Sequence, residues 1–308
     1  GGTAGKEMPI AMMLNSNGQA ITLSKDFCGA IGFKDLTTVG SGVNALKAKK
    51  EVTFAMTFPG GTHDMWLRYW LAAAGIDQST VKIITIPPPQ MVANMKVGNM
   101  DGYCVGEPWG GVAVQEGIGF TQIASQDIWK QHPEKALVVN KEFLTTRRED
   151  VKNVMRAVLE ASTWIDDLGN RRSAAPTIGS EAYVNAPSNV IDARLQGQYS
   201  LGCALGDTTY TDDSMIFSNG GLVNFPRKAH GIWFMAQYVR FGLLAQPPEY
   251  QAIADRLIQH DLYTEVATEM RLPIPDDDMS PFTLDLDNLT FDPKDPAASL
   301  RRYRPLAA

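Results

Sequence analysis

The sequence is short of the features that mark several classes of protein. Among its 308 residues it has three cysteines and four histidines. Cys28, Cys104 and Cys203 are widely spaced and form no CxxC pair, so buried thiols are expected and cysteine usage indicates no redox compartment. No apolar run reaches the roughly 18–20 residues that a membrane-spanning helix needs.

Catalytic and metal-binding signatures are also missing. The histidines have no zinc-ligand spacing, and no serine or cysteine nucleophile is paired with a base in a known pattern. Residues 285–288 lack the glycine and the closing glutamate of a calcium loop, so a solvated acidic tail is expected there. The sequence therefore supports neither an enzyme nor a metal site, and it implies no cofactor.

The charge balance narrows the choice of partner. The net charge is -6 and the sequence pI is about 5.3. This mild acidity argues against nucleic acid or an anionic membrane as the main partner. It does not exclude a small anion, since the field inside a pocket need not follow the net charge. The length and a hydrophobic content of 44% indicate about two domains with substantial cores.

The first half of the chain alternates strand-like and helix-like segments. Residues 52–56 predict a strand, and a Pro-Gly-Gly loop leads into a helix that begins at Thr62 and stops at Gly75. Similar segments follow, with extended chain at 9–23, strands at 81–86, 101–105, 120–124 and 137–140, a helix at 90–97 and Pro108 in the first turn of another. This alternation predicts an open α/β sheet with helices on both faces.

The second half is predicted to be mainly helical. An apolar stripe that includes Val154 marks residues 151–165, and further helices are expected at 230–244 and 249–270. The Pro- and Asp-rich tail from Leu272 is expected to be irregular. Residues 40–45 have a glycine spacing found in dinucleotide sites but lack the flanking strand and helix, so a plain loop is expected.

Two glycine-containing turns are candidate anion sites. Gly60, Gly61 and His63 stand at a helix start, where free N–H groups and the helix dipole attract anions. The alternative is a capped helix with a half-buried histidine. Val105 and Gly106 end a strand before another helix, so an anion can approach the backbone closely. The alternative there is a tightly packed turn.

Two polar side chains extend this set. Lys135, within His-Pro-Glu-Lys, is a possible point charge for an anion, although a solvated surface lysine is the simpler interpretation. Gln19 follows Asn-Ser-Asn-Gly, and its amide is able to donate to an oxyanion. A turn-forming polar cluster is the alternative.

Several segments in a fixed order resemble one family. They are LNSNGQAI (14–21), TFPGGTHDMWLRYWLAAAG (57–75), PPPQMVANMKVG (87–98), YCVGEPW (103–109), HPEKA (132–136) and TFDPKDP (290–296). This series is similar to the nitrate-binding and bicarbonate-binding proteins of cyanobacterial-type ABC transporters. The resemblance covers nearly the whole chain, and the pair THDMW and CVGEPW is its most specific part.

The resemblance implies a receptor and its ligand contacts. It implies a two-lobed, periplasmic-binding-protein-like clamp of type II with the ligand between the lobes. It assigns ligand binding to Gln19, His63, Val105, Gly106 and Lys135. In bicarbonate-type relatives the position of Lys135 is acidic and works with calcium, whereas a lysine needs no metal. Nitrate is therefore the expected ligand, with nitrite second.

The resemblance also implies an arrangement along the chain. Lobe I is expected to comprise residues 1–23 and 131–271, lobe II residues 24–130, and the C-terminal wrapping tail residues 272–308. The first lobe is expected to be incomplete at the N-terminus, with the export signal outside this chain. A periplasmic receptor, anchored or not to the outer face of the inner membrane, would deliver its ligand to a membrane permease and ATPase.

Alternatives remain open at this point. Bicarbonate, a sulfonate and a pyrimidine precursor are the alternative cargoes. A cytoplasmic nitrate-sensing relative, a receptor domain fused to a transporter ATPase and an enzyme on the same fold are the other candidates.

Overall fold

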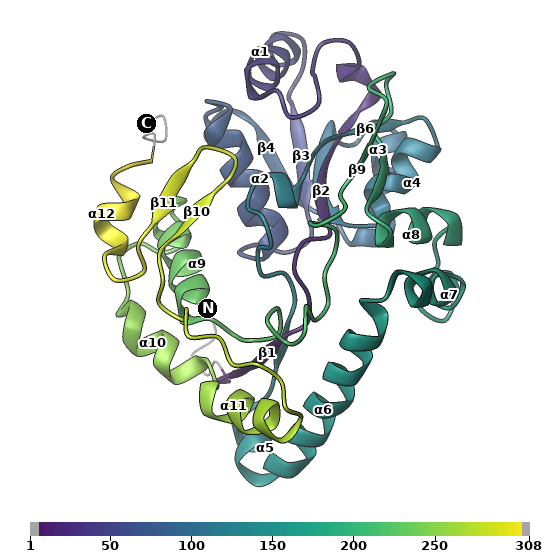
Figure 1. The fold of residues 1–308 in the computed structure, drawn as a ribbon. Helices are drawn as coiled ribbons and strands as arrows, with labels where there is room; N and C mark the ends of the chain where they lie inside the picture. The colour runs from purple at the N-terminus through teal and green to yellow at the C-terminus, as the bar shows by residue number, and fades with distance from the viewer. Residues whose placement is uncertain (1–5, 304–308) are drawn as a thin grey trace.

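A five-stranded mixed sheet forms the centre of one part of the molecule. The computed structural model describes residues 6–303, and Figure 1 shows this sheet at the top. Its order is β4 (Lys82–Thr85), β3 (Thr53–Met56), β5 (Gly102–Gly106), β2 (Gln19–Ser24) and β6 (Gly119–Ala124). β3 runs parallel to β4 and β5, whereas β2 is antiparallel to both of its neighbours. The predicted α/β sheet is confirmed. The structure also shows that its strands are partly parallel and partly antiparallel.

Helices cover both faces of this sheet, as predicted. Successive residues of a strand point to opposite faces, and Phe54 and Ala55 of β3 accordingly belong to different apolar clusters. α1 (Leu36–Lys47) and α2 (Thr62–Ala73) pack in the cluster of Phe54. The cluster of Ala55 contains residues of α3 (Met91–Lys96), α4 (Trp109–Gln115) and α8 (Ser188–Leu195).

A second group of elements surrounds a short two-stranded sheet. β1 (Ile10–Met13) pairs antiparallel with β7 (Ala136–Val138). A separate apolar cluster joins residues of β1 to residues of the surrounding helices. The helices of this group are α5 (Lys141–Thr146), α6 (Arg148–Ile165), α9 (Lys228–Arg240), α10 (Tyr250–Leu257) and α11 (His260–Glu269). Of these helices, α5, α6 and α11 supply residues to this cluster and lie in the lower part of Figure 1, whereas α9 and α10 lie on the left and supply Trp233 and Ala254 to the cluster of Phe54.

The remaining elements are short connectors and attachments. They are α7 (Leu168–Gly179), β8 (Gln198–Ser200), β9 (Asp207–Thr209), β10 (Phe282–Leu284), β11 (Leu289–Phe291) and α12 (Pro296–Leu300), with 3-10 turns at Lys25–Phe27, Gln78–Thr80, Pro88–Gln90 and Ser125–Asp127. Among the described residues, none of the helices has both the length and the apolar character needed to cross a membrane.

The glycine-containing segment at 40–45 is helical, so the predicted loop is wrong. It lies inside α1, whose first N–H groups donate to the side chain of Asp35. A methyl group on Gly40 would lie 2.8 Å from the Ala74 carbonyl oxygen, and one on Gly42 would lie 2.6 Å from Ile31. Close packing of α1 therefore uses these glycines and overrides their weak helix propensity.

The C-terminal predictions also need correction. The tail is not irregular throughout, because β10 and β11 form a hairpin that buries Phe291 in the main apolar cluster. The helix expected over 249–270 is divided into α10 and α11. The break lies where Ile258 bridges Ile10 and the N–H of Gln259 donates to the Ile10 carbonyl. Val154, placed on the buried stripe, is 50% exposed.

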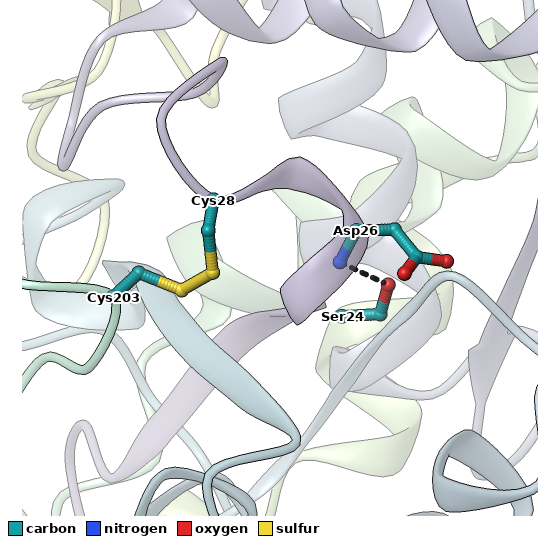
Figure 2. The surroundings of a disulfide bond; sticks show 4 residues. All are labelled: Ser24, Asp26, Cys28 and Cys203. Carbon is teal, nitrogen blue, oxygen red and sulfur yellow. Dashed lines mark hydrogen bonds between the residues drawn. A yellow bond between two sulfur atoms is a disulfide. The ribbon is translucent and has the colours of Figure 1, made fainter.

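Two of the three cysteines form a disulfide, which corrects the expectation of free thiols. Figure 2 shows Cys28, just after the strand β2, joined to Cys203, after β8. Their Cα atoms lie 5.4 Å apart although 175 positions separate them in the sequence. Such a separation leaves no local spacing signal. Cys104 is a buried free thiol, as predicted.

The packing differs from the predicted lobe boundaries at two places. β2 belongs to the five-stranded sheet, so the boundary after Leu23 falls inside one of its strands. α8 and β8, which were placed in lobe I, pack against α4 of the sheet layer. Three chain segments meet between the two groups of elements, where Ser16 forms bridges to Pro133 and to Ile216.

Candidate functional site

Gln19, Gly106 and His63 come from three different elements and lie together. Gln19 begins β2 and is the cross-strand partner of Gly106, the last residue of β5. A methyl group on Gly106 would lie 3.7 Å from Nε2 of His63. The strand register therefore brings the amide of Gln19 and the glycine turn to the N-terminus of α2. Val105 differs, because its side chain packs in an apolar cluster and only its backbone is available.

The N-terminus of α2 presents polar groups that its own residues do not satisfy. Its N-cap is Gly61, which has no side chain to accept from the first N–H groups. His63 is 8% exposed, and its Nδ1 shares a hydrogen bond with the Thr57 hydroxyl. Its Nε2 has no hydrogen-bond partner among residues 6–303. This helix end therefore offers a positive potential together with an unpaired ring nitrogen.

The imidazole of His63 is neutral at pH 7. Burial lowers its pKa to about 4, with the nearby carboxylate of Glu134 acting in the opposite direction. The hydrogen bond with Thr57 fixes the ring orientation. His63 is therefore suited to a hydrogen bond with a ligand, and it supplies no permanent positive charge.

A chain of hydrogen bonds links Gln19 to Glu134. The Gln19 amide donates to the Thr62 hydroxyl over 2.6 Å, and that hydroxyl donates to Oε2 of Glu134 over 3.0 Å. Oε1 of Glu134 lies 3.9 Å from Nε2 of His63. Thr62 is the first residue of α2, so the carboxylate sits close to the positive end of that helix.

Lys135 contributes the positive charge of the site, and it is paired. Its ammonium group contacts Oε1 of Glu134, and its side chain is 55% exposed while that of Glu134 is 4% exposed. Burial raises the pKa of the Glu134 carboxyl. The charges of Lys135 and His63 and the hydrogen bonds from Lys135 and Gln19 outweigh that effect and hold the pKa below its usual value. Glu134 is therefore ionised at neutral pH.

Thr62 and Glu134 were not singled out from the sequence, although both lie within the motifs quoted for the family. Thr62 stands beside His63 in GGTHD, and Glu134 precedes Lys135 in HPEKA. Neighbouring residues of an extended segment point to opposite sides, which predicts that only one of Glu134 and Lys135 faces the site. The long stem of Lys135 brings its amine back to the carboxylate, and only the tertiary structure reveals this contact.

Within residues 6–303, no group of three or more His, Cys, Asp or Glu side chains is placed to hold a metal ion. Asp287, in the segment compared with a calcium loop, instead accepts a hydrogen bond from Tyr69. A polar pocket of about 250 Å³ lies beside Trp129, Arg227 and His230, and it includes none of the five predicted ligand residues.

Known proteins of similar sequence and structure cover almost the whole chain. Residues 1–179 match the NMT1-like family. The nitrate/nitrite binding protein NrtA of Synechocystis sp. is 36% identical over 97% of this chain and 67% of its own length. The bicarbonate-binding protein CmpA of Synechococcus elongatus is 26% identical over 97% of this chain and 73% of its own length.

A solved structure extends this similarity to the fold. The crystal structure of the periplasmic nitrate-binding protein NrtA from Synechocystis PCC 6803 matches 97% of this chain and 78% of that protein. The TM-score is 0.92 at 32% sequence identity. The resemblance predicted from the motifs and the predicted periplasmic-binding-protein-like fold are both confirmed.

Proposed function

Because this chain belongs to the NMT1-like family, we propose that it is the solute-binding receptor of an ABC importer and takes nitrate, with nitrite as a second ligand. The observation that carries this proposal is the convergence of Gln19, His63, Gly106 and Lys135 at the N-terminus of α2. These residues come from distant parts of the chain. A receptor requires such a set of donors, and we propose a binding role without catalysis.

The chemistry of the donors suits a small, planar, singly charged oxyanion. Burying such an ion without partners is costly. The ammonium of Lys135 would offset its charge, and the amide of Gln19, the ring of His63 and the backbone at Val105 and Gly106 would bind its oxygens. Charge-assisted hydrogen bonds contribute roughly twice as much as neutral ones, so Lys135 is expected to contribute most.

Lys135 also favours nitrate over bicarbonate. A carboxylate at this position would require a cation between it and a bound anion, because like charges at contact distance repel. A lysine removes that requirement. We therefore propose binding without a metal ion.

The expected location is the periplasm, and the expected partners are a membrane permease and an ATPase. The disulfide between Cys28 and Cys203 supports an oxidising compartment, where such bonds form and persist. Anchoring to the outer face of the inner membrane remains part of the proposal.

We also propose a clamp motion between the two groups of elements. The segments around Ser16, Pro133 and Ile216 lie side by side between them. Asn17, next to Ser16, donates to Asp213 and to the Ser214 carbonyl. In this proposal these crossings form the hinge, the first lobe boundary lies ahead of β2, and α8 and β8 belong with the sheet. Closure would bring Lys135 and the N-terminus of α2 around the ligand.

Calorimetric titration of nitrate into the wild type and Lys135→Gln tests this proposal. The substitution is expected to weaken nitrate binding by about 10- to 100-fold, the usual effect of losing a hydrogen bond to a charged group. The substitution also removes the ionic partner of the buried Glu134 carboxylate, so the free energy of unfolding is measured alongside to confirm that the variant is folded. Lys49→Gln, at another exposed lysine, is the matched control for net charge. Equal affinities of wild type and Lys135→Gln, or binding of bicarbonate only with calcium, would contradict the proposal.

A further inference from the structure

Glu134 is a buried negative charge inside a site proposed to take an anion. Its side chain is 4% exposed and its carboxyl is ionised at neutral pH. Two negative charges at contact distance in a site with little water repel each other strongly. Lys135 brings one positive charge, which Glu134 already neutralises. The proposed function therefore leaves unexplained how an anion is bound with Glu134 in place.

The geometry indicates what Glu134 does in the unliganded protein. Its Oε1 accepts from the ammonium of Lys135 and lies 3.9 Å from Nε2 of His63. Its Oε2 accepts from Thr62, which in turn accepts from Gln19. A carboxylate, like nitrate, is a flat group that carries its negative charge on oxygen atoms. Glu134 thus engages two of the three side-chain donors assigned to the ligand, Lys135 directly and Gln19 through Thr62, and lies beside the unpaired ring nitrogen of His63.

The charged and titratable groups around Glu134 come from several elements. They are Lys135 and His132 from its own segment, His63 and Asp64 from α2, Cys104 from β5, and Arg227 and His230, which line a pocket together with Glu134. His63 and His132 are both buried and have pKa values of about 4. Asp64 is engaged with Arg68. Glu134 is therefore the acidic group that stands directly among the donors.

We propose that Glu134 is an internal substitute for the bound anion, and that an oxyanion enters as Glu134 takes up one proton from solvent and releases Lys135. This inference rests on the proposed function and adds a specificity-determining residue to it. The neutral carboxyl then has an O–H that is able to donate to the incoming anion. No bond other than this O–H forms or breaks. The net change in charge within the site is zero, which suits a buried location.

The proposal predicts that nitrate binds more tightly at lower pH. Between pH 7.5 and 5.5 the affinity of the wild type should rise by up to about tenfold for each unit of pH, the limit for uptake of one proton. Glu134→Gln keeps the size and shape of the side chain and removes its charge. This variant should bind nitrate at least about tenfold more tightly at pH 7.5, and its affinity should vary little over the same range.

Calorimetric titration with sodium nitrate tests both statements. Titration in two buffers of different ionisation enthalpy measures proton uptake, which should approach one for the wild type and zero for Glu134→Gln. Glu142→Gln, an exposed position on α5, changes the net charge equally and should behave as the wild type. Weaker binding by Glu134→Gln, or nitrate binding by the wild type without proton uptake, would overturn the proposal. The proton count of the wild type decides the matter if the variant does not fold.

The outcomes separate this inference from the function on which it rests. Nitrate binding by the wild type with an affinity independent of pH would leave the receptor function intact and refute the role of Glu134. A failure of both the wild type and Glu134→Gln to bind nitrate or nitrite at pH 5.5 and 7.5 would refute both.

Discussion

Successive turns of α2 differ in what their side chains contact. The first turn carries Thr62 and His63, whose polar atoms face the candidate site and include a ring nitrogen without a partner. The following turns carry Trp66 and Trp70, which are completely buried. Trp66 packs against Trp129 and Trp233, three rings we call the tryptophan cluster.

This difference separates stability from binding within one helix. The tryptophan cluster buries large apolar side chains, and such burial is the main stabilising contribution in folded proteins. The first turn leaves donors open, which contributes little to stability and is what a ligand requires. His132 connects the two regions, since its ring packs on Trp66 while Glu134 and Lys135 follow within three residues. The packed tryptophan cluster thus positions the first turn of α2, whose polar groups are not all hydrogen-bonded.

Removing a ring from the tryptophan cluster is the largest expected perturbation. Trp233→Ala should lower the free energy of unfolding by about 3–5 kcal/mol, because it leaves a large cavity in a packed core. Urea unfolding followed by circular dichroism measures this change. Trp164→Ala is the matched control, since Trp164 is 50% exposed on α6, and it should cost much less. Similar losses of unfolding free energy in the two variants would show that the tryptophan cluster contributes no more to stability than an exposed tryptophan.

Removal of the disulfide tests whether the end of the sheet opposite the candidate site is stabilised by the covalent bond between Cys28 and Cys203. Cys28→Ser combined with Cys203→Ser should lower the free energy of unfolding by about 2–4 kcal/mol, because the link closes a long loop of the unfolded chain. Reductant should destabilise the wild type by a similar amount and leave the double variant unchanged. Nitrate affinity should hold, since both cysteines lie outside the site. A loss of affinity would show that the site depends on this distant end.

The pH dependence of the free energy of unfolding gives a smaller effect that involves buried histidines of both the candidate site and the tryptophan cluster. Burial lowers the pKa values of His63 and His132 to about 4 and that of His230 to about 3. Between about pH 6.5 and 4 the unfolded chain therefore binds protons that the folded protein excludes. Stability is present above this window and falls as the pH is lowered through it. Each histidine should contribute about 1.4 kcal/mol per pH unit.

Unfolding in urea at a series of pH values measures how steeply the free energy of unfolding changes with pH. Single-residue variants then show how much of this slope comes from the candidate site and how much from the tryptophan cluster. His132→Phe should reduce the slope by one proton and leave nitrate affinity unchanged in a folded sample. His63→Gln should reduce it by the same amount and also weaken nitrate binding. An unchanged slope in both variants would contradict the assignment of neutral buried rings.

Much of the fold was predictable because it depends on local patterns. The loop–helix unit at 59–75 combines a glycine turn, apolar residues at helical spacing and a glycine stop, and all three act over a few residues. Four of the five strands of the sheet were predicted to within a few residues for the same reason, whereas the single extended segment expected at 9–23 is divided into β1 and β2. Predictions failed where distant contacts decide, as in α1, whose glycines are used for close packing against Ala74 and Ile31.

The candidate site was predictable only in part. The motifs named Gln19, His63, Gly106 and Lys135, and the strand register and helix packing place them together. Lys135 in the motif HPEKA favours nitrate over bicarbonate, but the balance of charge around it depends on contacts that the motifs do not contain. Glu134 illustrates this limit, because its carboxylate accepts a hydrogen bond from Thr62, which lies 72 positions away along the chain.

The sequence by itself determined the family and most of the order of strands and helices, and it supplied a set of candidate donor residues, since all of these are encoded in short segments. The tertiary structure alone decided that the buried carboxylate of Glu134 contacts some of those residues and that Cys28 bonds to Cys203. It also decided that Trp66 of α2 packs against Trp129 and Trp233. The physical reason is the same in each case. The energy of a buried charge, a disulfide or an aromatic contact depends on distances between segments, and linear spacing does not specify those distances.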